Sequence, residues 1–166
     1  SSIGGATFAG TSVLSVAAGS QANVNAGLIN LLADGFGADP ANASNFAGQF
    51  AVDVSGGNVN AGALFASSTG DRLGSDLGRS RLVAQSGNLN VATTLTARTS
   101  GDLLIRTLDG GIIGGPATAA TTTTIDLDAN GTIEISGDGS SGGLGGRTID
   151  ALAGRSILLS GNISTR

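Results

Sequence analysis

The chain has 166 residues, of which 40% are hydrophobic and only 12% are charged. This balance is the reverse of that in disordered chains, so an ordered fold with a sizeable core is expected. The net charge is −4, every basic residue is arginine, and no basic patch with interleaved aromatic residues occurs, which argues against nucleic-acid binding. The absence of cysteine and histidine excludes disulfides, Cys/His zinc sites and Ser-His or Cys-His nucleophile pairs.

Small residues dominate the rest of the composition. The 29 glycines show no strict every-third spacing, which excludes collagen, and serine, threonine, asparagine and alanine accompany them. Such a mixture is typical of many short strands joined by tight turns. No uncharged apolar stretch reaches the roughly 18 residues that a membrane span needs, so no transmembrane segment is expected.

The first third of the chain predicts short strands and one helix. Val13, Val16 and Val24 lie in segments with strand character. Ala26–Ala33 is rich in leucine and isoleucine, and it is predicted as the single short helix of the chain. Gly37–Ala47, which contains an Asp-Pro pair, is predicted as a loop.

Strand signals strengthen after this loop. Gln49–Leu64 shows alternating apolar residues and is predicted as strand, whereas the polar Ser67–Ser80 is predicted as a surface loop. From Leu82 onward strand signals are frequent. Gly110–Ala120 and Gly137–Gly146 are predicted as glycine-rich loops that interrupt them.

An internal repeat organises the second half of the chain. Leu95–Ile105, Ile125–Ile135 and Ile149–Leu159 each contain two apolar residues two apart, and then two more that start eight residues after the first. A spacing of two is the period of a strand, and the even offset keeps both runs facing one core. Looser copies contain Asn-Val-Asn-Ala or Asn-Leu-Asn-Val. The second strand of each copy is therefore expected to begin near Val24, Val59, Leu89, Leu103, Ile133 and Ile157.

Two all-β architectures fit this repeat. The favoured one is a parallel β-solenoid, or β-helix, with glycine-rich loops between its strands. The alternative is an antiparallel, hairpin-rich sandwich. In that arrangement the loop Ala129–Gly131 would pair Leu127 with Ile133 and Ile125 with Ile135, with glycine at a left-handed position.

We expect residues 1–166 to form a single β-solenoid domain or a fragment of one, with 1–80 less regular and 81–166 carrying the clear repeats. Gly161–Arg166 stops inside the repeat pattern, with no polar helix or charged strand to cover it. An uncovered last strand invites another one to pair with it. The expected partners are therefore further repeats or other copies of the same chain.

One segment resembles the start of a calcium-binding loop. Asp126, Asp128 and Asn130 alternate before a glycine, and oxygen ligands at alternate positions suit a hard cation. The twelfth position is Gly137 instead of a carboxylate, and Asp138 lies one residue late. The favoured interpretation is a strand with outward aspartates followed by an Asn-Gly turn. Calcium is the only cofactor considered, no residues form a catalytic constellation, and an enzyme is not expected.

Paired asparagines form a second candidate feature. They flank single apolar residues, at Asn23, Asn25, Asn58, Asn60, Asn88 and Asn90. They could stack as amide ladders or present a polar binding face, and stacking is favoured. Thr121–Thr124 could likewise present a threonine ladder, although a short β-branched strand is the simpler interpretation.

Three segments carry a resemblance to a known family. TLTARTSGDLLIRT, TIDLDANGTIEIS and TIDALAGRSILLSGNIST resemble the repeats of filamentous-haemagglutinin-like exoproteins of two-partner secretion, and of related autotransporter adhesins. The resemblance covers about Ser86–Thr165. It implies a right-handed parallel β-helix, export by a Gram-negative bacterium to the outer cell surface or medium, and a role in attachment to host-cell or glycan surfaces or in cell-surface structure.

Two further functions are considered beside this one. The first is a self-assembling subunit of an extracellular filament, sheath or surface layer, which would use the uncovered end of the repeat. The second, less favoured, is a β-helix enzyme that acts on polysaccharides, for which nothing in the spacing of the acidic residues selects a catalytic pair.

Overall fold

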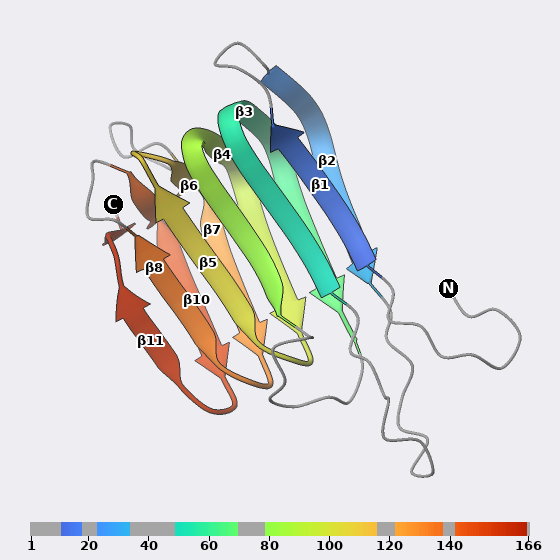
Figure 1. Ribbon diagram of the computed structural model, residues 1–166, viewed down its shortest axis with the longest axis vertical. Coiled ribbons are helices and arrows are strands. Elements are labelled where there is room, and N and C mark those ends of the chain that lie inside the picture. The colour runs from blue at the N-terminus through green and yellow to red at the C-terminus, as the bar shows by residue number, and fades with distance from the viewer. Residues whose placement is uncertain are drawn as a thin grey trace, which may run out of the picture.

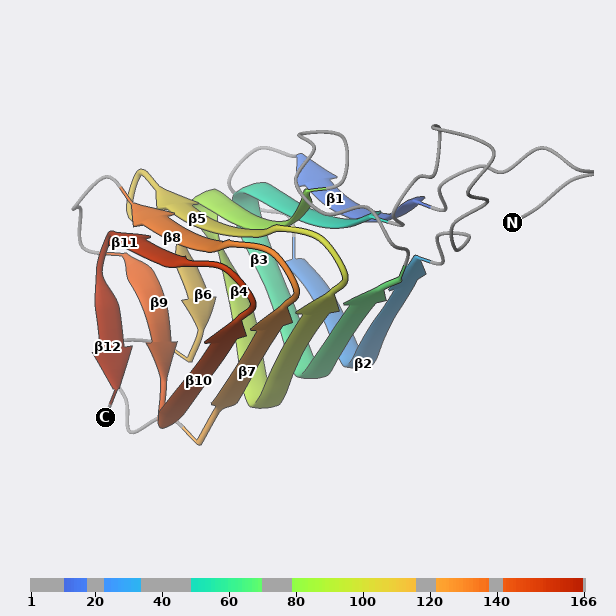
Figure 2. The same cartoon turned by 90° about the horizontal axis from the view of Figure 1, so that it is seen from below.

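The computed structural model describes residues 11–17, 23–33, 49–69, 79–115, 122–137 and 142–165, and the regular structure in these ranges is all strand. The strands form one 12-stranded sheet, and every pairing within it is parallel. Figure 1 shows the strands side by side, and Figure 2 shows that the sheet curls around a common interior. The prediction of an all-β fold is confirmed.

The strands differ widely in length. They are β1 (Thr11–Ala17), β2 (Asn23–Ala33), β3 (Gln49–Ser68), β4 (Ser80–Thr99), β5 (Leu103–Leu108), β6 (Ile112–Gly114), β7 (Thr124–Ala129), β8 (Ile133–Gly137), β9 (Gly143–Gly146), β10 (Thr148–Ala153), β11 (Ile157–Ser160) and β12 (Ile163–Thr165).

The pairings sort these strands into three parallel ladders. The first ladder contains β1, the N-terminal parts of β3 and β4, and then β5, β8 and β11. The second contains the N-terminal part of β2, the middle parts of β3 and β4, and then β6, β9 and β12. The third contains the C-terminal parts of β2, β3 and β4, and then β7 and β10. The chain visits the ladders repeatedly in this order.

Alternate side chains of all three ladders fill one hydrophobic core. They stack in register as columns: Val52, Leu82, Ile105 and Ile135 in the first ladder, Val59, Leu89, Ile113 and Leu144 in the second, and Leu64, Leu95 and Ile125 in the third. Each such side chain contributes roughly 1.5–3 kcal/mol when it is fully buried. In-register stacking keeps like residues together, so the apolar columns run through successive strands.

The internal repeat is confirmed by the registers. Leu95 pairs with Ile125, which pairs with Ile149, and the inner residues of the following strands align in the same way. The antiparallel hairpin alternative is wrong, because β7 and β8 pair with other strands in parallel and not with each other. Gly131 is not left-handed either. A Cβ there would lie 2.9 Å from the carbonyl oxygen of Gly101 and would overlap the Oδ1 atom of Asp102, so the turn leaves little room for a side chain.

The predicted helix at Ala26–Ala33 is wrong. These residues belong to β2, where Leu28–Ala33 pair in register with Ala63–Ser68 of β3. Leu31 and Ala33 are buried, whereas Leu28 and Leu32 are exposed. The period of two therefore applies, and pairing with β3 overrides the local helix preference of the leucines.

The second strands of the repeat are also assigned wrongly in part. Leu103, Ile133 and Ile157 lie in the first ladder, but Val24, Val59 and Leu89 lie in the second, where their partners further along are Ile113, Leu144 and Ile163. The Asn-Val-Asn-Ala segments therefore belong to a different ladder from the strands that begin at Leu103, Ile133 and Ile157.

The predicted loops need correction where the structure describes them. Ile112–Gly114 and Gly143–Gly146 are strands β6 and β9, inside segments predicted as glycine-rich loops. At the ends of the predicted loop Ser67–Ser80, Ser67 and Ser68 belong to β3, and Ser80 begins β4 as a buried residue. The predicted loop Gly37–Ala47 and the middle of Ser67–Ser80 lie outside the described residues.

Candidate functional site on the outer face of the second ladder

The outer face of the second ladder begins with two columns of stacked asparagines. Asn58 Nδ2 donates to Asn23 Oδ1 at 3.1 Å. In the neighbouring column, Asn60 Nδ2 donates to Asn25 Oδ1 at 2.9 Å, and Asn90 Nδ2 donates to Asn60 Oδ1 at 2.8 Å. The parallel register brings these amides side by side, so the predicted stacking is confirmed for these five asparagines.

Both columns of asparagines end where β6 joins the ladder, and the hydrogen bonds of the first column already end at Asn58. Asn90 pairs in register with Gly114, which has no side chain to continue the ladder. Gly114 has a φ of +97°, and a Cβ there would overlap the carbonyl oxygen of Gly145. In the other column Asn88 is followed by Ile112. The Asn88 side chain makes no hydrogen bond to any residue within the described ranges. The fold itself therefore ends the amide ladders at this point.

An open groove lies at the end of the amide ladders. It has a volume of about 380 Å³ and is lined by Asn60, Ala61, Asn88, Asn90, Val91, Ala92 and Ile112. The asparagines supply amide donors and acceptors, and the other lining side chains are apolar. The groove therefore combines an apolar surface with hydrogen-bonding groups, and none of the described residues that line it is charged.

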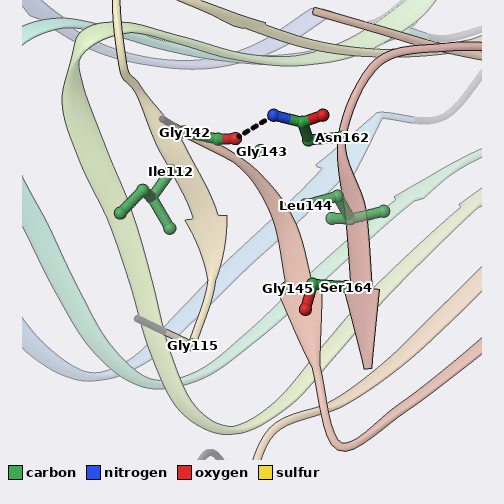
Figure 3. A pocket seen from close by; sticks show the side chains of 8 residues that line it. All are labelled: Ile112, Gly115, Gly142, Gly143, Leu144, Gly145, Asn162 and Ser164. Carbon is green, nitrogen blue, oxygen red and sulfur yellow. Dashed lines mark hydrogen bonds between the residues drawn. The ribbon is translucent and has the colours of Figure 1, made fainter. Parts of the chain in front are cut away.

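A second, smaller hollow lies on the other side of Ile112. Figure 3 shows it between Ile112 and Asn162, over the glycines of β9. Asn162 Nδ2 donates to the carbonyl oxygen of Gly142 at 3.3 Å and closes one edge of the hollow. Its volume of about 30 Å³ suits little more than one water molecule. The groove at the asparagines is therefore the larger candidate site.

Two pairs of oppositely charged side chains lie on the outer faces of the other two ladders. Arg81 donates from Nε and Nη2 to the two carboxylate oxygens of Asp53, at 2.9 and 2.7 Å. Arg98 Nη2 lies 2.9 Å from Asp126 Oδ2. These side-chain hydrogen bonds raise the pKa of each arginine above its ordinary value. Because arginine is already charged at neutral pH, the pairs fix side chains in place without creating a titratable switch.

Three of the predicted calcium ligands lie on β7 or directly after it. Asp126 and Asp128 lie on β7 at alternate positions, partly exposed, and Asp126 accepts the hydrogen bond of Arg98. Asn130 follows β7 and is exposed, and Asp138 lies outside the described residues. In the described ranges, no three acidic, cysteine or histidine side chains form a group that could hold a metal. Calcium binding stays a prediction, which a calcium titration followed by the melting temperature would test.

Of the predicted strand Thr121–Thr124, Thr124 alone among the described residues belongs to a strand, β7, and Thr121 lies outside the described residues. Outward threonines do stack at Thr124. Thr94 pairs with Thr124, which pairs with Thr148. The hydroxyl of Thr122 donates to the carbonyl oxygen of Ala92 at 2.8 Å. The neighbouring outward positions hold Asp126 and Asp150. The column is therefore one row of hydroxyls beside a row of carboxylates, and not a broad threonine array.

Sequence reasoning identified the asparagines but missed the groove that they line. Ile112 and Ala92 complete it, and Ile112 comes from a segment predicted as a loop. The signal that was available is the single apolar residue between two small or polar ones. It occurs at Val59 and Leu89, and again at Leu144.

In comparisons with known proteins, the chain matches no protein-family model, no curated protein sequence and no solved structure. Over the described ranges, no helix has the length and apolar character that crossing a membrane requires. The class that the fold defines is an all-β protein with a curled parallel sheet.

Proposed function

We propose that the chain is part of a right-handed parallel β-solenoid. The repeated order of the three ladders supports this, because each return from the third ladder to the first begins a new layer on the last. Backbone hydrogen bonds continue the stacking across the connecting turns: Gly131 N donates to Gly101 O at 3.0 Å, and Arg155 N donates to Gly131 O at 3.1 Å. Right-handed winding is the general rule for connections between parallel strands.

Introduced cysteine pairs test this stacking of successive layers, since the chain has no cysteine of its own. Thr124 and Thr148 are partners in the third ladder, and Val83 and Arg106 are partners in the first. Adjacent strands lie about 4.8 Å apart, within disulfide reach. A solenoid should form both disulfides in one monomer without loss of thermal stability. A Thr124→Cys/Ser136→Cys control should form none, and a disulfide there would contradict the proposal.

We further propose that the protein is a secreted or cell-surface structural and adhesive protein of a Gram-negative bacterium, and not an enzyme. The observation that carries this proposal is the in-register stacking of outward side chains on all three ladders. The amide ladders and the stacked threonines are two examples. A stack of this kind presents the same chemistry repeatedly along a rigid surface, which suits attachment. The resemblance of 86–165 to exoprotein repeats points to the same role.

Attachment can be measured directly. The fluorescently labelled chain is applied to cultured epithelial cells and to glycan-coated surfaces, with the heat-unfolded chain as the control. Retention of the folded chain well above the unfolded chain is expected on at least one surface. Equal retention of the two on every surface would contradict the adhesive role.

A second candidate function is self-assembly into an extracellular filament, sheath or surface layer. One observation favours it: Leu159 points to the core side in register with buried Ile135, yet it is 61% exposed. Ile157 and Ile163 are exposed in the same way. Among the described residues, β10, β11 and β12 each pair with a strand on one side only. A second copy that stacked there would bury these side chains and satisfy the open backbone edge.

Electron microscopy and sedimentation velocity test self-assembly. Leu159→Arg should prevent filament formation, because the charge would be buried between copies. Leu158→Arg is the matched control, since Leu158 is 53% exposed on the same strand but points outward beside Glu134. A monodisperse wild-type chain, or filaments that survive Leu159→Arg, would contradict this candidate.

A further inference from the structure

We infer that the groove at the end of the amide ladders binds a neutral saccharide. This inference specifies the ligand class of the adhesive surface proposed above and rests on that proposal for its biological role. The groove is lined by Asn60, Asn88, Asn90, Ala61, Val91, Ala92 and Ile112, and its volume of about 380 Å³ falls in the range of small-ligand sites.

The first argument concerns the hydrogen-bonding capacity that the ladders leave unused. Each asparagine amide has two N–H donors and a carbonyl acceptor. Asn90 uses one N–H group for the bond to Asn60 Oδ1. The next residue in register is Gly114, which has no side chain that could donate to the Oδ1 atom of Asn90. The Asn88 amide makes no hydrogen bond within the described part of the chain. Donors and acceptors therefore lie together in one groove, as the hydroxyl groups of a sugar require.

The second argument concerns rigidity. Asn60 both donates to Asn25 and accepts from Asn90, so the amides beside the groove are held in fixed orientations by the ladder. Preorganised groups lose little conformational entropy when a ligand binds. Ile112 and Ala92 add an apolar wall against which the C–H face of a sugar ring can pack.

The third argument selects a neutral ligand over an acidic one. No arginine is among the described residues that line the groove, so a carboxylate or sulfate would find no cation to pair with there. The polar side chains that line the groove are uncharged asparagine amides, which form hydrogen bonds with neutral hydroxyl groups. A neutral glycan is therefore favoured over an acidic polysaccharide.

The test is a titration of the full chain with neutral hexasaccharides of glucose, mannose and galactose, and with acidic hexagalacturonate. Binding is followed by calorimetry and by NMR of the asparagine side-chain amides. At least one neutral probe should shift the amide signals of Asn88 and Asn90. Asn88→Ala should weaken binding about three- to tenfold, the loss expected for one neutral hydrogen bond. Its melting temperature should not change.

Two further variants keep the result interpretable. Asn30→Ala removes an exposed asparagine from the outer face of the third ladder, so it should leave binding unchanged. Ala92→Leu fills the groove at an exposed position and should weaken binding without removing any hydrogen bond. The inference would be overturned if no neutral probe bound at a concentration of about 10 mM.

Two other results would also overturn it: unchanged binding by Asn88→Ala, or tighter binding of hexagalacturonate than of every neutral probe. The inference and the adhesive role fail separately. If Asn88→Ala left surface attachment intact, the groove would not be the attachment site, and the adhesive role would still stand. If the chain bound a saccharide but attached to no surface, the adhesive role would fail and the groove would still be a saccharide site.

Discussion

The second ladder differs from the third in the number of large core residues that a single strand contributes. In the third ladder two core residues alternate within one strand, as Ile125 and Leu127 do in β7. In the second ladder β9 has one large core residue, Leu144, with glycine on both sides. All three ladders pair in the same parallel way. The comparison teaches that backbone pairing and one apolar column are enough to hold a strand in place when neighbouring strands fix its register.

The largest expected effect tests the dependence of the second ladder on the third. Ile125 is fully buried, and its Cδ1 atom lies close to the glycine backbone of β6 and β9. Ile125→Ala should therefore open a cavity between two ladders and lower the free energy of unfolding by about 2–5 kcal/mol. Urea denaturation measures this loss. Leu152→Ala, at a side chain 68% exposed, should stay within about 0.5 kcal/mol, and a loss as large as that of Ile125→Ala would break the comparison.

The next effect tests whether glycine in the second ladder is required. Gly114→Ala should cost about 2–4 kcal/mol, because φ is +97° and the new Cβ would meet the backbone of Gly145. Gly27→Ala is the matched control, since a Cβ there meets nothing within 4 Å. It should be neutral or slightly stabilising, through the lower entropy of the unfolded chain. If thermal denaturation showed equal losses of stability for the two variants, the close approach of the Gly145 backbone would not be the reason for glycine at position 114.

A smaller effect separates the amides that build the ladder from the amide that lines the groove. Asn60→Ala removes two side-chain hydrogen bonds and should lower stability by about 1–2 kcal/mol. Asn88→Ala removes no such bond within the described ranges and should change stability by less than about 0.5 kcal/mol. Chemical denaturation of both variants measures the difference. Equal losses would mean that the ladder contributes no more than any exposed asparagine.

The smallest effect concerns the ion pairs outside the second ladder. Arg81→Ala should cost at most about 1 kcal/mol at low salt, because the Arg81 and Asp53 side chains remain 43% and 31% exposed and water screens their attraction. The raised pKa of Arg81 means that its contribution is present below the arginine's ordinary titration range and is lost only as the pH rises through the raised value. Loss above about 2 kcal/mol, or no salt dependence, would contradict this account.

The sequence alone determined the strands in which apolar residues alternate. The spacing in 95–105, 125–135 and 149–159 set both the strand positions and the facing of Leu95, Ile125 and Ile149, because a period of two has only one inward face. The asparagine ladders were likewise predictable, since equal offsets from an inward valine or leucine place like amides side by side.

Only the tertiary structure decided what the glycine-rich and leucine-rich segments would become. Gly143–Gly146 has no alternating pattern, and its strand form depends on pairing with β6 and β12. Ala26–Ala33 has the composition of a helix, and pairing with β3 makes it a strand. The groove is decided in the same way, because Asn60, Asn88 and Ile112 meet only when successive passes of the chain stack in register. Where apolar and polar side chains alternate, the local sequence is enough to specify a strand. Where they do not alternate, hydrogen bonds to the backbone of neighbouring strands specify it.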